Sequence, residues 1–229
     1  MKIIKGDIHK VIKELPSNEY DLLYTNPPFN GLTQASWDKN LSWINLWDDI
    51  WRVMKPSGVV ILHSTQRFTI ELCGSCLNHF KYKMVWKKNN STGFLSSKYQ
   101  PLRECEDICV FYKKSGIYNP QMRGNDYHIK RNVKFGGGQK YWGEGNKKEN
   151  EYQRDEGHFG RFPTDFLEYP IKKGNGAGTR CNELIEYIIK TYSNEKSKVL
   201  DITCYDAITG VICDKLKRQY TGIDLNPTY

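Results

Sequence analysis

Long apolar runs are missing from this sequence of 229 residues. No segment approaches the roughly 18 consecutive apolar residues that a membrane-spanning helix requires. The first residues, MKIIKGD, become polar too early for the apolar centre of a secretion signal. Histidine is scarce too, and none of the five is spaced as His-x-x-x-His, the pair that binds a metal from one helix face. We therefore expect a cytoplasmic protein with no membrane span.

The seven cysteines are an odd number, and without an export signal we expect their thiols to be reduced. Cys73-x-x-Cys76 and Cys105-x-x-x-Cys109 together offer four thiolates, the number that a structural zinc site uses. Burial is the better interpretation, because Cys73 and Cys76 lie in an apolar, helix-like stretch and Cys109 lies in a strand-like run. We predict no metal site.

Acidic residues are fewer than basic ones, and the excess of basic residues is concentrated in two segments of the chain. The chain has 34 Lys and Arg against 26 Asp and Glu, a formal net charge of +8. Residues 81–103 contain six Lys or Arg and no acid, and residues 113–154 contain ten against four acids. A clustered basic surface suits a polyanion such as nucleic acid, although a solvated lysine-rich face has the same sequence pattern.

Short apolar segments alternate with longer amphipathic ones along most of the chain. Strand-like patterns cover residues 20–25, 59–62, 82–86, 108–112, 198–202 and 220–224. Helix-like patterns cover residues 8–15, 44–54, 68–80, 182–192 and 208–216. Residues 55–58, Lys-Pro-Ser-Gly, indicate a turn. The alternation predicts an α/β fold, with a mainly parallel sheet and helices on both faces.

Residues 113–165 break this pattern, because they are rich in Gly, Asn, Lys and Tyr and show no steady period. The three glycines at 136–138 are not a phosphate-binding loop, since no strand precedes them and no Lys-Ser/Thr follows them. We expect one domain built from residues 1–112 and 166–229, with residues 113–165 inserted as a separate region.

Asn26-Pro27-Pro28-Phe29 directly follows the strand-like segment at 20–25. Ligands bind at the carboxyl ends of strands in open parallel sheets, so these residues are expected at a binding edge. Proline fixes φ and has no N–H, which keeps the turn stiff and its carbonyls free to accept hydrogen bonds. The Asn26 side-chain oxygen and the Pro27 carbonyl would accept both hydrogens of an exocyclic amine, and Phe29 would stack on a flipped base. An ordinary Pro-Pro turn is the alternative.

A second functional segment lies near the C-terminus. Residues 199–201, Val-Leu-Asp, precede a loop and a helix, and residues 222–224, Gly-Ile-Asp, end the next strand. A strand, a turn, a helix and a second strand ending in an acid form half of a nucleoside-binding unit, whose terminal acid binds ribose hydroxyls. We assign that role to Asp224, against the alternative of a plain βαβ unit with surface acids.

The two segments together resemble a β-class DNA amino-methyltransferase of bacterial and viral modification systems. In that family the motif order is circularly permuted, with the catalytic Pro-Pro segment N-terminal and the methyl-donor segment C-terminal, as in this chain. Further family-like motifs are Lys5-Gly6-Asp7, Trp37-Asp38-Lys39, residues 52–58, Trp86-Lys87-Lys88 and residues 118–122. The resemblance covers residues 1–112 well and residues 182–229 moderately. It implies a Rossmann-like fold that uses S-adenosylmethionine to methylate an exocyclic amino nitrogen of a flipped base in double-stranded DNA.

The resemblance also implies roles for individual residues. Catalysis would fall to Asn26, Pro27, Pro28 and Phe29. S-adenosylmethionine would contact Asp7, Ile8, Asn26, Asp201, Thr203, Tyr205, Asp224 and Leu225. DNA would contact Lys87, Lys88, Arg123, Lys130, Arg131, Lys134 and Lys140. Tyr141 and Trp142, in the inserted target-recognition region, would pack against bases or form a small core.

The donor segment departs from the family pattern. Relatives usually have Asp-Pro-Phe-x-Gly-x-Gly after the first donor strand, whereas residues 201–207 are Asp-Ile-Thr-Cys-Tyr-Asp-Ala. Tyr205 and Ala207 replace both glycines, which permit positive φ and close ligand approach. We expect them to crowd the donor loop and to weaken or abolish S-adenosylmethionine binding. The usual His-Pro-Thr-Gln-Lys-Pro-like segment is also replaced, at residues 175–181.

Several alternatives stay open at this point. A catalytically inactive DNA-binding or partner-binding relative would explain the altered donor segment. A methyltransferase for RNA or for a protein glutamine amide would also use Asn-Pro-Pro, but there the donor loop precedes that motif, and only 25 residues precede it here. Adenine N6 is favoured over cytosine N4 as the target. A homodimer or a heteromeric partner is compatible with the sequence.

Overall fold

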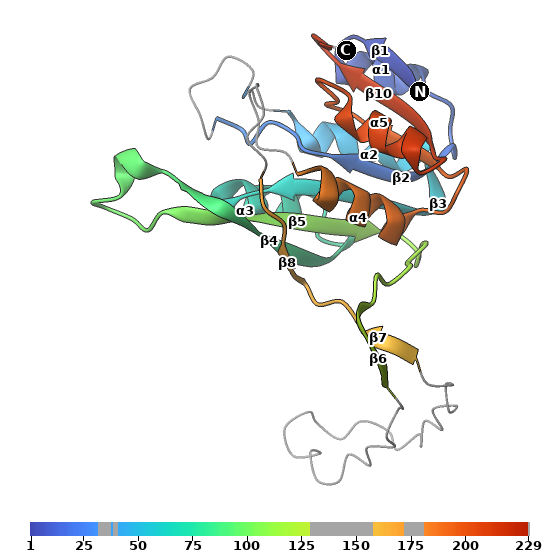
Figure 1. Ribbon diagram of the computed structural model, residues 1–229. Helices are drawn as coiled ribbons and strands as arrows, with labels where there is room; N and C mark the ends of the chain where they lie inside the picture. The colour runs from blue at the N-terminus through green and yellow to red at the C-terminus, as the bar shows by residue number, and fades with distance from the viewer. Residues whose placement is uncertain (32–37, 39–40, 129–157, 172–180, 229) are drawn as a thin grey trace, which may run out of the picture. The chain divides into compact units, whose positions relative to one another are not determined.

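The structure is a computed structural model that describes residues 1–31, 38, 41–128, 158–171 and 181–228. The chain divides into two compact units, one of Met1–Asn119 with Thr164–Tyr229 and one of Pro120–Pro163. The larger unit holds an eight-stranded sheet flanked by helices (Figure 1). None of the described helices is long and apolar enough to cross a membrane.

Most neighbouring strands of the large sheet run parallel, as the sequence predicted. The strands are β1 (Lys2–Lys5), β2 (Tyr20–Thr25), β3 (Met54–Ser64), β4 (Phe80–Thr92), β5 (Arg103–Tyr112), β8 (Phe166–Glu168), β9 (Lys198–Asp201) and β10 (Gln219–Asp224). Their order in the sheet is β1-β10-β9-β2-β3-β5-β4-β8. All pairs from β1 to β3 are parallel, β5 is antiparallel to β3 and β4, and β8 is parallel to β4. The strands β9 and β10 therefore lie between β1 and β2.

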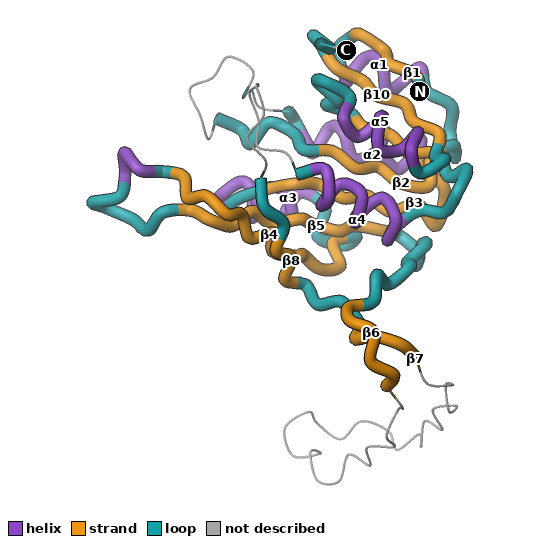
Figure 2. Tube along the Cα trace, in the orientation of Figure 1, coloured by secondary structure: helices purple, strands orange, loops and turns teal. Residues whose placement is uncertain are grey.

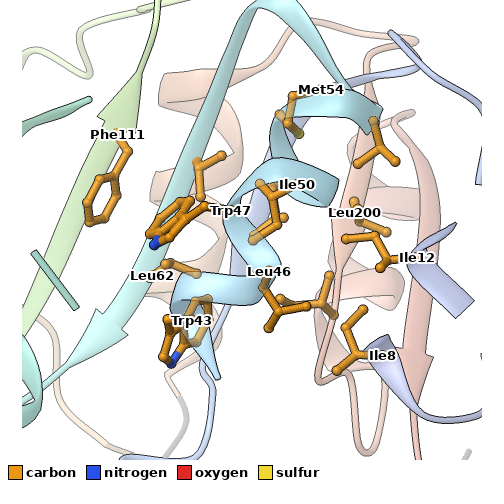
Figure 3. Packing of buried hydrophobic residues seen from close by; sticks show 14 of the residues in the cluster. Ile8, Ile12, Trp43, Leu46, Trp47, Ile50, Met54, Leu62, Phe111 and Leu200 are labelled. Atoms are coloured by element: carbon orange, nitrogen blue, oxygen red, sulfur yellow. The ribbon is translucent and has the colours of Figure 1, made fainter. Parts of the chain in front are cut away.

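Helices cover both faces of this sheet. The helices α1 (Ile8–Glu14), α2 (Trp43–Val53) and α3 (Gln66–Ser75) pack on one face, and α4 (Asn182–Tyr192) and α5 (Ile208–Lys215) pack on the other. Successive strand residues alternate between the faces, so Leu23 of β2 joins the first core and Leu22 the second. Figure 3 shows the first core, where Ile50 of α2 lies between Phe111 of β5 and Ile12 of α1. Each fully buried side chain of this kind contributes about 1.5–3 kcal/mol.

The predicted turn at residues 55–58 lies inside β3. The ladder between β2 and β3 is irregular there, with its break between Tyr20 and Leu22 of β2. Glycine is needed at position 58, because a Cβ atom on Gly58 would lie 3.0 Å from the carbonyl oxygen of Lys55. The structure thus places residues 55–58 in a strand with an irregular ladder, where the sequence predicted a turn.

The strands β4 and β5 form a hairpin that is much longer than the sequence predicted (Figure 2). Strand-like patterns covered only residues 82–86 and 108–112, but the ladder continues to the pair Thr92–Arg103. The pairing of β5 with β3 stops at Asp107, so the hairpin extends past the carboxyl end of β3.

The smaller unit contains an antiparallel pair, β6 (Arg123–His128) and β7 (His158–Arg161), that the sequence did not predict. Gly160 has a φ of +77°, and a Cβ atom there would lie 2.7 Å from the carbonyl oxygen of Gly124. Glycine at 160 therefore permits the close approach of the two strands. The chain between them, including the glycines at 136–138, lies outside the described residues.

Candidate active site

The carboxyl ends of β2, β3 and β9 meet at one edge of the large sheet, where the sequence predicted a binding site. An open pocket lies there. Its lining includes Tyr24 and Asn26 from the end of β2, His63 from β3, Trp86 from β4, and Asp201 and Thr203 from the end of β9. The structure thus brings the Asn-Pro-Pro segment and the donor segment together, although they lie near opposite ends of the chain.

Hydrogen bonds join the end of β2 to the end of β9 at this pocket. The Thr25 hydroxyl donates to Asp201 Oδ1 (2.7 Å) and lies 2.6 Å from the Thr203 hydroxyl. Thr203 Oγ1 donates to the backbone carbonyl of Asn26 (3.3 Å). Among the described residues, none hydrogen-bonds to the Asn26 side chain, which lines the pocket. Thr203 thus holds the backbone of Asn26, and no other described residue occupies the hydrogen-bonding groups of its side chain.

Aromatic contacts anchor the turn after Asn26. Pro28 and Phe29 are half-buried. The Phe29 ring centroid lies 5.6 Å from that of Phe68 on α3, which is only 3% exposed. Phe68 in turn lies 6.2 Å from the ring of Trp43 on α2. The Phe29 ring is therefore held in place by the core beneath it, while Pro27 is fully buried.

Asp201 is buried and organises the loop that follows β9. Besides the Thr25 hydroxyl, its carboxylate accepts hydrogen bonds from the Thr203 N–H (3.2 Å) and the Tyr220 hydroxyl (3.2 Å). Burial, and then the negative charge of Asp201, raise the pKa of Tyr220 above its usual value, which keeps this hydroxyl protonated as a donor. Asp201 is thus an anchor between strands, a role that its sequence motif did not indicate.

The loop after β9 has a backbone conformation that glycine favours, although it contains no glycine. Tyr205 has a φ of +46° and Ala207 a φ of +51°, both in the left-handed region. The Tyr205 N–H donates to Asp224 Oδ2 (2.9 Å), which ties the loop to the end of β10. Left-handed backbone costs about 1–2 kcal/mol for a residue with a Cβ atom, so this contact and the burial of Ala207 hold a strained loop.

Gly6 and Asp7 lie beside Asp224, because β1 and β10 are neighbours. The Gly6 N–H donates to the Asp224 backbone carbonyl (2.9 Å), and the Asn226 N–H donates to Asp224 Oδ1 (2.8 Å). Asp7 is exposed and caps α1 by accepting from the His9 N–H (2.9 Å). The acids predicted to contact the donor therefore stand at adjacent strand ends.

The two apolar residues predicted to contact the cofactor differ in exposure. The Ile8 side chain is buried in the core of the α1 face, so it packs within the fold and only its backbone can face a ligand. Leu225 follows β10 and is 60% exposed, which leaves its side chain accessible.

A buried charged network, which sequence reasoning missed, adjoins the pocket. Lys88 Nζ lies 2.7 Å from Glu106 Oε1, with side-chain exposures of 5% and 10%. Glu106 Oε2 lies 3.7 Å from His63 Nδ1, and His63 Nε2 lies 2.8 Å from the Tyr24 hydroxyl. Burial alone would raise the pKa of Glu106, but His63 and Lys88 together hold it below its usual value. Because Tyr24 and His63 line the pocket, the network supports one of its walls.

This network corrects the prediction that Lys88 contacts DNA. The Lys88 ammonium is paired inside the protein and is not on a surface that a phosphate can reach. The alternation of side chains along a strand also predicts that Lys88 is buried, because it follows Met84 and Trp86 at a spacing of two on the buried side of β4. Its neighbour Lys87 has a side chain that is 43% exposed, 3.4 Å from Glu168.

Of the remaining predicted DNA contacts, Arg123 is exposed on β6 in the smaller unit. Lys130, Arg131, Lys134 and Lys140 lie outside the described residues, as do Tyr141 and Trp142. Within the described part of the chain, no group of three His, Cys, Asp or Glu is placed to hold a metal ion. Of the cysteines weighed for zinc, Cys73 and Cys109 place their sulfur atoms 3.5 Å apart.

Known proteins share both the sequence pattern and the fold. The sequence model of the DNA methylase family, the N6/N4 methyltransferases, matches residues 20–229. The chain belongs to this family. This N6/N4 methylase is 26% identical to the DNA adenine methyltransferase YhdJ of Escherichia coli strain K12, over 99% of its own length and 79% of that protein.

Solved structures resemble the methylase along almost its whole length. The cytosine-N4-specific PvuII DNA methyltransferase superimposes with a TM-score of 0.69 at 13% identity, covering 99% of this chain and 82% of that one. A complex of M1.HpyAVI with S-adenosylmethionine superimposes with a TM-score of 0.61 at 18% identity, covering 98% and 94%. These likenesses confirm the predicted Rossmann-like methyltransferase fold.

Proposed function

We propose that this methylase transfers a methyl group from S-adenosylmethionine to an exocyclic amino nitrogen of a base in double-stranded DNA. One observation carries the proposal: Asn26, whose side chain no described residue hydrogen-bonds, lines the same pocket as Asp201 and Thr203 of the donor segment. In such a transfer the amine and the methyl donor must meet in one site, so that the nitrogen attacks the methyl carbon in line. The shared pocket supports this requirement.

The residues at the donor end fit S-adenosylmethionine. Each carboxylate oxygen of Asp224 accepts one backbone N–H, which leaves acceptor capacity for ribose hydroxyls. Asp201 and Asp224 together place negative charge at the site, which favours a ligand that carries positive charge on sulfur and nitrogen. When bound, S-adenosylmethionine supplies an electrophilic methyl group on its sulfonium. Asp7, Thr203 and Tyr205 are the further residues that would hold it.

Asn26 and Pro27 would activate the target amine. The lone pair of an exocyclic amine is delocalised into the base ring, which makes the nitrogen a weak nucleophile. By accepting both N–H hydrogens, the Asn26 side-chain oxygen and the Pro27 carbonyl would draw the nitrogen toward a tetrahedral shape. Asn26 has no charge with which to take up a proton, so the proton that the nitrogen releases passes to water. Phe29 would stack on the base once it has left the duplex.

We place adenine N6 ahead of cytosine N4 as the target. Supporting this order is the 26% identity with YhdJ, which is named a DNA adenine methyltransferase. Both amines present the same two hydrogens to Asn26 and Pro27, so the preference has to come from contacts around the ring.

We assign target recognition to residues 113–165, inserted between the catalytic parts 1–112 and 166–229. Residues 113–154 carry ten Lys or Arg against four acids, and Arg123 is exposed on β6. Contacts from such side chains to phosphates would supply most of the DNA affinity and fix the register on the duplex.

The test uses DNA from a bacterial host that lacks adenine-N6 and cytosine-N4 methylation. After expression of the protein, host DNA is digested to nucleosides and weighed by mass spectrometry, and we expect N6-methyldeoxyadenosine. Asn26→Ala is the control, because it keeps the backbone carbonyl that Thr203 holds, and its DNA should carry far less of the mark than DNA from cells with the wild type. Unmarked DNA from cells that contain folded wild-type protein would overturn the proposal.

A second candidate is a DNA-binding relative that transfers no methyl group, and the strained backbone of Tyr205 and Ala207 favours it. Calorimetry with S-adenosylmethionine separates the two. Binding tighter than about 100 μM that is lost in Asp224→Ala supports the enzyme. Absence of binding, with duplex affinity retained, supports the second candidate.

A further inference from the structure

The tip of the β4–β5 hairpin, residues 93–102, exposes an unusual amount of apolar surface. Leu95 is 97% exposed, Tyr99 90%, Phe94 78% and Leu102 43%. Turns usually carry small or polar residues. Large apolar side chains gathered on one exposed feature indicate a surface that another molecule covers.

The hairpin tip is held in shape by its own backbone. Gly93 has a φ of +89° and begins the short 3-10 helix η1 (Phe94–Ser96), where the Ser96 N–H donates to the Gly93 carbonyl (3.0 Å). Below the tip, the ladder pair Thr92–Arg103 is joined by a bond from the Thr92 hydroxyl to the Arg103 carbonyl (3.3 Å). The apolar side chains therefore stand on a preformed support, and little ordering is needed before they bind.

The tip projects from the edge of the sheet that holds the candidate active site. Because β3 and β4 are both antiparallel to β5, their carboxyl ends lie at one edge, with Asn26 at the end of β2 beside them. Pairing of β5 with β3 ends at Asp107, and residues 103–106 continue beyond it (Figure 1). At about 3.3 Å per residue, the base of the tip stands about 13 Å past the end of β3.

Charge and shape favour DNA as the occupant. The tip has no acid, and Lys98 is exposed within it. A two-stranded β-ribbon fits the major groove of duplex DNA. Phe and Leu are also among the side chains with which proteins wedge base steps apart. A convex tip suits insertion into a stack of bases better than contact with a flat protein surface.

We propose that the hairpin tip inserts Phe94 and Leu95 into duplex DNA and opens a base step near the target base, with Lys98 against the phosphates. The inference rests on the proposed function, which makes DNA the partner at this edge. A base that leaves the stack opens an apolar gap, and the two side chains fill it. The tip therefore acts on the duplex, whereas Asn26 acts on the base that has left it.

Plasmid relaxation tests the wedge without a methyl donor and without a known recognition sequence. A closed circular plasmid is relaxed by a type I topoisomerase in the presence of saturating protein, then deproteinised, and its topoisomers are resolved on a gel. We expect wild-type protein to leave a lowered linking number, because each inserted wedge unwinds the duplex locally.

Three variants are compared with the wild type. Phe94→Ser with Leu95→Ser should reduce the linking-number shift about fivefold or more. Leu77→Ser makes the same change at a residue that is 67% exposed, before β4 begins at the opposite edge, and should leave the shift unchanged. Leu95→Ser alone, at the 97% exposed position, is the milder variant and should give an intermediate shift.

The outcomes separate the wedge from the proposed function. An unchanged shift in the double variant overturns the wedge, and so does the lack of any shift with wild-type protein. Tritium transfer to the same plasmid reports methylation independently, so a shift without transfer refutes only the proposed function. Sedimentation tests whether a second copy of the chain, and not DNA, covers the tip. If the double substitution dissociates a dimer while the plasmid shift persists, the tip binds a second copy and the wedge is refuted.

Discussion

The candidate active site has a base side, the turn of residues 26–29 after β2, and a donor side, the loop of residues 202–207 after β9. Both lie at the same edge of the large sheet, but their backbone conformations are stabilised differently. On the base side, Asn26 is followed by two prolines and a phenylalanine packed on the core, and each residue type suits its backbone. On the donor side, Tyr205 and Ala207 hold a left-handed backbone that residues with a Cβ atom avoid. The contrast teaches that tertiary contacts, here the hydrogen bond from Tyr205 to Asp224, can keep a loop shape whose favoured residues are absent.

The largest expected effect is on the free energy of unfolding, when the buried charged network of Lys88 and Glu106 beside the pocket is broken. Lys88→Met leaves Glu106 buried without its cation and should lower the free energy of unfolding by about 3–5 kcal/mol. Lys87→Met changes the adjacent, exposed lysine and should cost less than about 1 kcal/mol. Urea denaturation measures both. Equal, small losses would show that Lys88 is solvated, and would restore it as a candidate DNA contact.

Removing the acceptor on the base side should separate chemistry from DNA affinity. Asn26→Ala deletes one of the two acceptors for the amine and should lower methyl transfer about a hundredfold to a thousandfold. Duplex affinity should stay within a few-fold, because phosphate contacts dominate it. Tritium transfer and fluorescence polarisation measure the two quantities. A parallel loss of DNA binding would contradict the separate roles proposed for the pocket and the basic segments.

Restoring glycine at positions 205 and 207 should relieve the backbone strain of the loop after β9 without changing the turn of residues 26–29. Tyr205→Gly, alone or with Ala207→Gly, should raise the free energy of unfolding by about 0.5–1 kcal/mol, since flexibility gained in the unfolded chain offsets part of the relief. It should also tighten S-adenosylmethionine binding in calorimetry. Tyr205→Ala is the matched control, because it removes the ring and keeps the Cβ atom. Equal tightening by both variants would identify the ring as the obstacle, and no tightening would mean that the loop already accommodates the donor.

The smallest expected effect is on the pH dependence of the unfolding free energy, and it comes from Glu106 in the buried charged network beside the pocket. The folded pKa of Glu106 lies below its ordinary value of 4.5, so its stabilising contribution is present above that pH and is lost as the pH falls through the folded value. Glu106→Gln should therefore flatten the decline of the unfolding free energy below about pH 4.5. Denaturation series at several pH values measure this slope, and an unchanged slope would assign the acid sensitivity to other carboxylates.

The elements that the sequence predicted well are those with a clear apolar period. Helix α4 was placed without error at both ends, and β2 and β10 within one residue, because apolar side chains recur at fixed spacing there. The far half of β4 was missed, since residues 87–92 are Lys-Lys-Asn-Asn-Ser-Thr and carry no apolar alternation. They belong to a strand because β5 pairs with Lys87 and Thr92 on either side of an irregular stretch, which is a tertiary cause.

The sequence predicted at which sheet edge the candidate site lies, but it did not predict the hydrogen bonds and ion pairs that connect the residues there. Asn26 follows a strand, Asp201 and Asp224 each end one, and in a parallel sheet such positions share one edge. The bond from Thr25 to Asp201 and the contact of Glu106 with His63 depend on which strands are neighbours, and no local pattern encodes that order.

The order of strands also sets when the protein can first work during its synthesis. The ribosome makes β9 and β10 after the other described strands of the large sheet, yet they fill the space between β1 and β2, which are made before them. Until they emerge, the early strands lack these partners, and pairing between such distant segments is slow. A chain released before β9 is made therefore lacks Asp201 and Thr203, and with them part of the pocket.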